Sequence, residues 1–254
     1  MASPQPVELN SHGYRLPCEI WMPPDLAGAH VALVLCHGAT QKGMRHELIR
    51  HLARTLSTRW PVLTFDLPGF GRAPRLVMRK PDDYLYYTHA LSAARKAEEL
   101  TGLKVVMVGH SMGGRVSLQA AARDGGSTIR GVVTIAGLYD FPRRPEDMMR
   151  LVEDFASFVR VRLELPAEEV ARYVALGRVM EEAVKAINVP LLAIEAGREH
   201  YQFIRDTRYK LFREARCPKM LVLLGKADHK FKDHHEVVSS VIRSWLEHQF
   251  ALHG

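Results

Sequence analysis

The sequence has few of the features that mark membrane-spanning and secreted proteins. No run of about 18 consecutive apolar residues is present, and the longest apolar runs, at 31–36 and 104–109, have the length of buried strands. Only 3 cysteines occur, Cys18, Cys36 and Cys217, and an odd number without paired spacing fits reduced thiols better than a disulfide framework. The first residues lack a basic segment followed by an apolar one, the pattern of a cleaved signal peptide. We therefore expect no membrane span and a cytoplasmic location.

Signatures of metal and nucleic-acid binding are also missing. The 13 histidines show no ligand spacing such as H-E-x-x-H, so we expect no metal ion. Lys and Arg number 35 against 28 Asp and Glu, a formal charge of +7, but the basic residues are spread along the chain with acids between them. This pattern predicts a solvated basic surface with a mild preference for anionic molecules, and no nucleic-acid partner.

The composition that remains is that of a globular protein. The 254 residues are 47% hydrophobic and 25% charged, enough for one large α/β domain, which we expect to span residues 1–254. Short apolar runs alternate with helical patterns, which predicts a mostly parallel, doubly wound sheet covered on both faces and preceded by an N-terminal β-hairpin. Strands are expected at 7–9, 16–22, 31–36, 62–65, 105–108, 131–136, 189–194 and 220–224, and helices around Leu48, Leu52 and Leu56 and at 83–100, 115–123 and 236–250.

One stretch interrupts this alternation. About fifty residues separate the strands ending at 136 and beginning at 189, and helical periodicity dominates them, notably at 148–159 and 168–186. A single crossover is shorter than this, so we expect a helical cap inserted at approximately 138–188. Two ordinary crossover helices with no role at a site are the alternative.

The strongest chemical signal is Gly109-His110-Ser111-Met112-Gly113, a G-x-S-x-G element between an apolar strand and a helix. A serine at so sharp a turn has strained backbone angles, and side chains two residues before and after it would collide with neighbouring backbone. Gly109 and Gly113 satisfy this requirement. The motif therefore predicts an exposed serine nucleophile at the N-terminus of a helix.

Three elements together resemble the α/β-hydrolase superfamily over nearly the whole chain: His37-Gly38, the segment 109–114, and Ala227-Asp228-His229-Lys230-Phe231 after the last strand. The resemblance implies a nucleophile, Ser111, activated by a base, His229, which follows it in the chain order of the family. It also implies an oxyanion hole formed by the backbone N–H groups of Ala39 and Met112. His37 and His110 are interpreted as structural.

The acid of the triad departs from the pattern of the family, which usually places Asp three residues beyond a glycine at this loop. Here Gly197 is followed by Arg198, Glu199 and His200, so a glutamate stands one position earlier. Glu199 is our first choice, and Asp140, after the preceding strand, is the alternative. Two further candidates are weaker: Asp206 is more distant, and Asp228 would have to fold back on its own backbone.

These residues predict a serine hydrolase that cleaves a carboxylic ester or related acyl bond of a small molecule through an acyl-enzyme intermediate, without a metal ion or an organic cofactor. The same serine also serves acyl transfer, thioester cleavage and carbon–carbon bond hydrolysis, which remain alternatives. A fold alone does not establish catalysis, so a non-catalytic ligand-binding or interaction protein is the hypothesis from another class. The oligomeric state and the substrate have no signature in the sequence.

Overall fold

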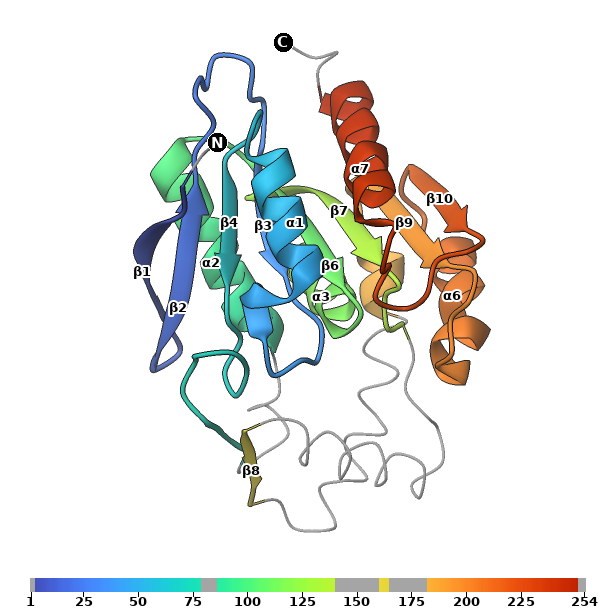
Figure 1. Ribbon diagram of the computed structural model, residues 1–254, viewed down its shortest axis with the longest axis horizontal. Helices are drawn as coiled ribbons and strands as arrows, with labels where there is room; N and C mark the ends of the chain where they lie inside the picture. The colour runs from blue at the N-terminus through green and yellow to red at the C-terminus, as the bar shows by residue number, and fades with distance from the viewer. Residues whose placement is uncertain (1–2, 79–85, 140–159, 165–181, 251–254) are drawn as a thin grey trace.

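A computed structural model describes residues 3–78, 86–139, 160–164 and 182–250, and its centre is an eight-stranded sheet (Figure 1). The strand order is β1-β2-β4-β3-β6-β7-β9-β10. The strands from β4 to β10 in this order run parallel, whereas β1 pairs with β2 and β2 pairs with β4 in antiparallel orientation. Their bounds are β1 Gln5–Ser11, β2 Tyr14–Trp21, β3 Ala32–Cys36, β4 Val62–Phe65, β6 Val105–His110, β7 Ile129–Ile135, β9 Leu191–Ala196 and β10 Lys219–Leu224.

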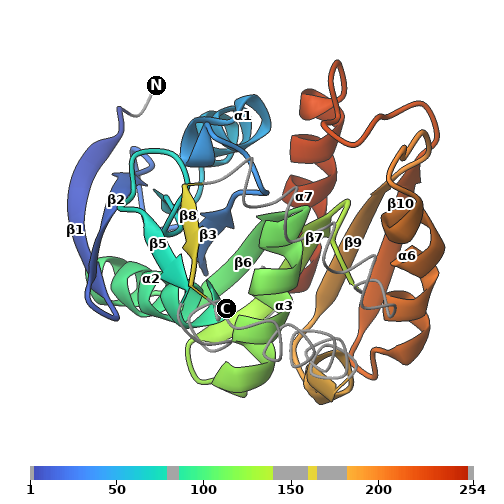
Figure 2. The ribbon, with the colours of Figure 1, turned by 90° about the horizontal axis from the view of Figure 1, so that it is seen from below.

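Helices cover both faces of the sheet (Figure 2). One face carries α2 (Tyr86–Thr101), α3 (Met112–Asp124) and α6 (Gln202–Glu214), and the other carries α1 (Glu47–Leu56) and α7 (His235–Phe250). Each helix buries an apolar stripe; in α1, Leu48, Leu52 and Leu56 recur every four residues and are fully buried. The two hydrophobic cores therefore lie on either side of a sheet whose central strands are buried throughout, as in parallel sheets generally. The expected doubly wound α/β fold is confirmed.

The N-terminal hairpin is also as predicted. β1 and β2 pair in antiparallel register from Gln5 opposite Ile20 to Ser11 opposite Tyr14. The two residues of the turn, His12 and Gly13, have positive φ angles of 47° and 81°, as the tight two-residue turn of a hairpin requires. The hairpin thus enters the main sheet through β2, which pairs with β4.

Several elements were not predicted from the sequence. The helix α6 contains many charged residues and was missed, as was the 3₁₀ turn Gly43–Arg45. A second sheet of two parallel strands, β5 (Leu76–Met78) and β8 (Val161–Leu163), was also missed because three-residue strands carry too little periodicity to be recognised. Strand ends elsewhere differ from expectation by a few residues.

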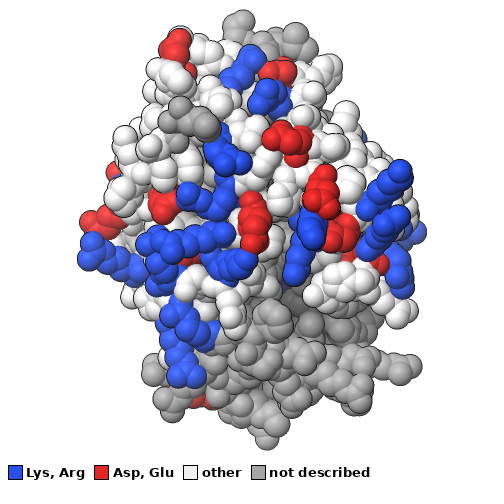
Figure 3. All heavy atoms as spheres, viewed as in Figure 1, with Lys and Arg blue, Asp and Glu red and all other residues white. Residues whose placement is uncertain are grey.

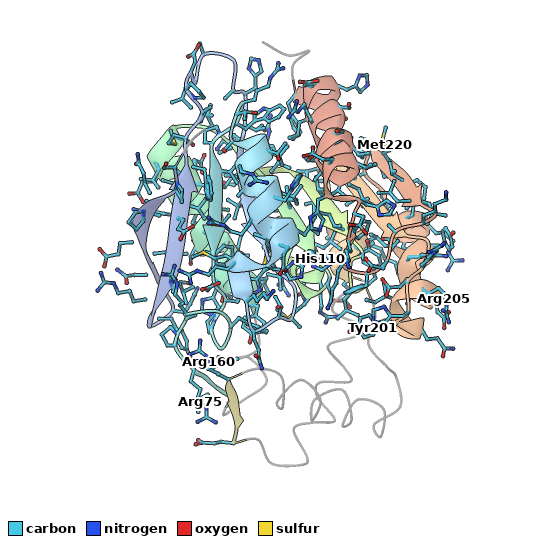
Figure 4. The ribbon with its side chains drawn as sticks, viewed as in Figure 1. Arg75, His110, Arg160, Tyr201, Arg205 and Met220 are labelled. Carbon is cyan, nitrogen blue, oxygen red and sulfur yellow. The ribbon has the colours of Figure 1, made fainter. Side chains whose placement is uncertain are left out.

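The expected cap at 138–188 lies mostly outside the described residues, as do the helix expected at 148–159 and most of the one at 168–186. The described parts of this stretch include helical residues at 182–186 and the strand β8, so the stretch is not purely helical, contrary to expectation. Arg160, just before β8, binds the loop after β4: its Nη2 donates to the backbone oxygens of Gly71 and Ala73 at 2.6 and 2.7 Å. Arg160, labelled in Figure 4, is therefore attached to that loop.

Candidate active site

Ser111 occupies a strained turn between β6 and α3. Its φ and ψ are 53° and −119°, a backbone conformation that residues other than glycine rarely adopt. Backbone hydrogen bonds hold the turn, with the Ser111 N–H donating to Ile135 O at 2.9 Å and the Leu138 N–H donating to Ser111 O at 3.1 Å. The serine therefore stands at the carboxyl end of the central strands, where sites of open α/β sheets lie.

The two glycines of the motif have the steric role that the sequence predicts. A Cβ on Gly109 would lie 2.1 Å from the backbone oxygen of Gly113, and a Cβ on Gly113 would lie 2.1 Å from the backbone oxygen of Cys36. Both contacts are with backbone, which cannot yield as a side chain can. Only glycine fits at these two positions.

His229 approaches Ser111 from the loop that follows β10. Its Nε2 lies 3.1 Å from Ser111 Oγ, although the two residues are 118 positions apart in the chain. Phe231 anchors this loop, since its side chain is fully buried and its φ is 53°. His229 is 7% exposed and so is largely shielded from water.

Glu199 completes the arrangement. Its Oε2 lies 2.7 Å from His229 Nδ1, and its Oε1 accepts the backbone N–H of Tyr201 at 3.0 Å. Burial acts to raise the pKa of Glu199, but the hydrogen bond and charge of His229 and the Tyr201 N–H outweigh it and hold this pKa below its ordinary value. An ionised carboxylate only accepts hydrogen bonds, so Nδ1 carries the proton and Nε2 is left to accept the serine hydroxyl.

The other acids considered from the sequence are placed differently. Asp140 lies outside the described residues. Asp206 is exposed on α6, and Asp228 Oδ1 accepts the backbone N–H of Lys232 at 3.0 Å, which closes the loop rather than touching the ring. Of the described carboxylates, that of Glu199 is hydrogen-bonded to His229.

The backbone N–H groups expected to form the oxyanion hole lie beside the serine. Met112 is the first residue of α3, and Ala39 follows Gly38, on which a Cβ would lie 3.1 Å from Ser111 Cβ. Within the part of the chain that the structure describes, neither N–H donates to another protein group. The role of these two groups as an oxyanion hole stays a prediction.

His37 has the bracing contacts expected of it. It is fully buried, its Nε2 accepts the Leu67 N–H at 3.0 Å, and its Nδ1 therefore carries the proton that it donates to Gly38 O at 2.7 Å. Burial lowers the pKa of His37, so the ring is neutral. It links the loops after β3 and β4 and shapes the turn that leads to Ala39.

Two groups near the site were not recognised from the sequence. The ring of Tyr201 meets that of His229 edge-on, with centroids 4.8 Å apart, at the start of α6 (Figure 4). Deeper in the protein, the Tyr139 hydroxyl donates to Glu195 Oε1 at 2.8 Å and lies 2.7 Å from Thr134 Oγ1. Burial raises the pKa of Glu195 to about 8. The one signal of this network in the sequence is an ionisable residue inside the apolar strand β9.

The described part of the chain has neither a surface of one charge sign in the view of Figure 3 nor a cluster of metal ligands. On the face shown in Figure 3, acidic side chains lie between the basic ones. Among the described residues, no group of three or more His, Cys, Asp or Glu side chains is placed to hold a metal ion. None of the described helices has the length and apolar character needed to cross a membrane.

Comparison with known proteins identifies the family to which this fold belongs. The family described as "alpha/beta hydrolase fold" matches residues 31–235, which include Ser111, Glu199 and His229. This chain belongs to the alpha/beta hydrolase family. No curated protein matches the sequence of this alpha/beta hydrolase significantly.

Solved structures resemble this alpha/beta hydrolase over nearly their full lengths. Dienelactone hydrolase from Anabaena variabilis is 17% identical, with a TM-score of 0.68, and the match covers 98% of this chain and 99% of that one. Est1E from Butyrivibrio proteoclasticus with bound ferulic acid is 18% identical, with a TM-score of 0.72 and coverage of 96% and 99%. The alpha/beta hydrolase GrgF from Penicillium sp. sh18 is 18% identical, with a TM-score of 0.73 and coverage of 98% and 99%. At these identities the likeness shows a shared fold.

Proposed function

We propose that this alpha/beta hydrolase is a serine hydrolase that cleaves carboxylic esters or related acyl bonds of small molecules. Ser111 is the nucleophile, His229 the base and Glu199 the acid, and residues 1–254 act as one domain with an inserted cap. The observation that carries this proposal is the continuous pair of hydrogen-bond distances, 3.1 Å from Ser111 Oγ to His229 Nε2 and 2.7 Å from Nδ1 to Glu199. A nucleophile, a base and an orienting acid in this order define an activated serine.

The proposed reaction has two halves. As Ser111 Oγ attacks the acyl carbonyl carbon, its proton passes to His229 Nε2, and the carbonyl oxygen becomes an oxyanion that binds the N–H groups of Ala39 and Met112. His229 then gives this proton to the oxygen of the departing alcohol, or to the sulfur of a departing thiol. The acyl group remains bound to Ser111 as an ester. Water attacks this acyl group and loses a proton to Nε2, which then passes a proton to Ser111 Oγ as the bond between Oγ and the acyl carbon breaks and the acid product is released. Each oxyanion donor is worth about 2.7–4 kcal/mol in reactions of this type.

Glu199 acts through His229. Its carboxylate keeps the proton on Nδ1 and stabilises the imidazolium formed in both halves of the reaction. Replacement by the isosteric amide in Glu199→Gln should lower kcat by about 10⁴-fold, the loss seen when the tautomer of such a histidine is no longer imposed. Asp140→Asn should leave kcat within a few fold of wild type, and the reverse order of effects would assign the acid to Asp140.

The decisive experiment requires no knowledge of the substrate. Wild type and Ser111→Ala are exposed to a fluorophosphonate, which reacts with activated serines, and their intact masses are compared. Labelling of one site in wild type and none in Ser111→Ala is expected. A folded wild type that remains unlabelled and turns over no member of an ester and thioester panel would refute the proposal and favour a non-catalytic ligand-binding role.

The panel of substrates separates the chemistries that one serine can perform. We expect small carboxylic esters to be hydrolysed, since the solved structures of similar fold include an esterase domain and Est1E with ferulic acid bound. Thioesters and acyl transfer to an added alcohol are tested alongside, because the similar structures also include a thioesterase domain. Product analysis by mass spectrometry assigns the reaction.

A further inference from the structure

His110, the residue before Ser111, contacts the main chain of His229, whereas Ser111 contacts the ring of His229. His110 is 4% exposed, and its Nε2 lies 2.8 Å from the backbone oxygen of His229. A carbonyl oxygen only accepts hydrogen bonds, so His110 Nε2 carries the proton and donates it. Two consecutive residues therefore hold His229, with Ser111 at the ring and His110 at the main chain.

The His110 ring has little freedom to move. On one side, a Cβ on Gly38 would lie 3.1 Å from its Nδ1, so backbone passes close to the ring. On another side His46, which is buried at the N-terminus of α1, stacks on it with centroids 5.6 Å apart and planes 20° apart. The His229 ring lies 5.1 Å away. His110 thus joins three loops that meet at the carboxyl end of the sheet.

The ionisation of His110 suits this role. Burial lowers its pKa well below the ordinary value, and the neighbouring charges of His229, His46 and His235 lower it further, against the opposing hydrogen bond to the His229 carbonyl. The ring is therefore neutral, with one N–H to donate. Its neutrality avoids placing a second cation beside the imidazolium that forms on His229 in the proposed reaction.

The loop that carries His229 has a backbone that departs from regular structure. Phe231 and Asp233 have φ angles of 53° and 64°, and the loop is closed by its own hydrogen bonds, from the Phe231 N–H to Asp228 O and from the Lys232 N–H to Asp228 Oδ1. These bonds lie within the loop and do not connect it to the turn that carries Ser111. Among the described residues, the His110 bond connects the main chain of His229 to the nucleophile turn.

We propose that His110 is a positioning residue that holds the main chain of His229 so that its ring meets Ser111 and Glu199 together. This inference rests on the proposed function for its effect on rate, but the geometry that it predicts is independent of activity. A displacement of about 1 Å at a reacting group can cost about 10²-fold in rate, so loss of one well-placed hydrogen bond is measurable.

The test compares two substitutions at one position with a matched control. His110→Phe keeps a planar ring but removes the donor, whereas His110→Gln places an amide N–H near the former Nε2. His89 supplies the control, because it is also 4% exposed and its Nδ1 forms one hydrogen bond of 2.8 Å, to Ser11 Oγ, at the contact of α2 with β1. His89→Phe therefore loses a comparable buried hydrogen bond away from the site.

We expect His110→Phe to lower both the fluorophosphonate labelling rate and kcat by about 10–100-fold, with KM within about threefold of wild type. His110→Gln and His89→Phe should keep both rates within about threefold of wild type. Thermal unfolding establishes that each variant is folded. Equal losses in His110→Phe and His89→Phe, or a wild-type rate in His110→Phe, would overturn the proposal.

A second measurement does not depend on catalysis. The proton between His229 Nδ1 and Glu199 should give a far-downfield resonance in the proton NMR spectrum of wild type, His110→Gln and His89→Phe, and this resonance should broaden or vanish in His110→Phe. Persistence of the resonance in His110→Phe, or its absence from folded wild type, overturns the positioning role. If wild type is not labelled but the resonance follows this pattern, the proposed hydrolase function fails while the positioning role stands.

Discussion

The strained backbone at Ser111 predicts an unusual order of stability between two variants. With φ at 53° and ψ at −119°, an L-residue here costs about 1–3 kcal/mol of strain that glycine avoids. Ser111→Ala and Ser111→Gly both remove the hydroxyl and its contact with His229, but only the glycine variant relieves the strain. Ser111→Gly should therefore be the more stable of the two, although glycine normally weakens a fold.

The magnitude follows from two opposing terms. Relief of strain contributes about 1–3 kcal/mol, and the greater freedom of glycine in the unfolded chain offsets about 0.4–1 kcal/mol of it. At the midpoints of these two ranges, the net advantage of Ser111→Gly is about 1.3 kcal/mol. An unfolding entropy of about 2.1 cal/mol/K per residue over 254 residues is about 0.5 kcal/mol/K, so the midpoint of thermal unfolding should differ by about 2–3 °C.

Differential scanning calorimetry at one pH measures this difference, and urea unfolding provides the free energies. An exposed serine outside the positive-φ region serves as control: at Ser127 the same pair of substitutions should show the opposite order, with Ser127→Ala the more stable. If Ser111→Ala is as stable as Ser111→Gly or more so, the strain inferred from the backbone angles is absent and the reasoning fails.

Three further substitutions probe the surroundings of the site. Because burial raises the pKa of Glu195 to about 8, the folded state holds a proton that the unfolded state releases above about 4.5, and stability should fall by up to about 1.4 kcal/mol per pH unit between these values. Urea unfolding from pH 5 to 9 should show this fall in wild type and a flatter profile in Glu195→Gln; parallel profiles would contradict it. Gly109→Ala should abolish fluorophosphonate labelling or folding, because its Cβ would overlap backbone, whereas Gly28→Ala, with nothing within 4 Å, should leave labelling and melting temperature unchanged. Asp66→Asn should cost about 1–3 kcal/mol in urea unfolding with little change in labelling rate, since the buried carboxylate accepts two backbone N–H groups at 2.7 and 2.8 Å; an unchanged stability would show that the amide satisfies both.

The features that could be predicted from the sequence are those set by local sterics and periodicity. The glycines around Ser111 follow from a turn whose geometry excludes side chains, and the core strands follow from short apolar runs. The helix α6 was missed because its charged residues obscure the few apolar positions, such as Ile204 and Leu211, that pack on the sheet. The strands β5 and β8 pair across more than eighty residues, which no local pattern reveals.

In the candidate site, too, some residues could be predicted from local sequence and others depend on contacts that the sequence does not reveal. Ser111 and His229 belong to motifs, but the choice between Glu199 and Asp140 depended on the path of a loop. The Tyr201 N–H that turns the Glu199 carboxylate toward the histidine is a contact two residues away that could not be foreseen from residue types. The bond from Tyr139 to Glu195 joins residues 56 positions apart and becomes visible only once β7 and β9 are known to be neighbours.

The order of strands has a consequence for how the site is acquired during synthesis of the chain. Ser111 follows β6, Glu199 follows β9 and His229 follows β10, and these strands join one side of the sheet in the order β6-β7-β9-β10. A nascent chain that has emerged only as far as β9 contains the strained turn but no base to activate it. In the proposed hydrolase the serine would therefore stay unreactive until β10 has docked, and reaction with a serine-directed probe would report completion of the sheet.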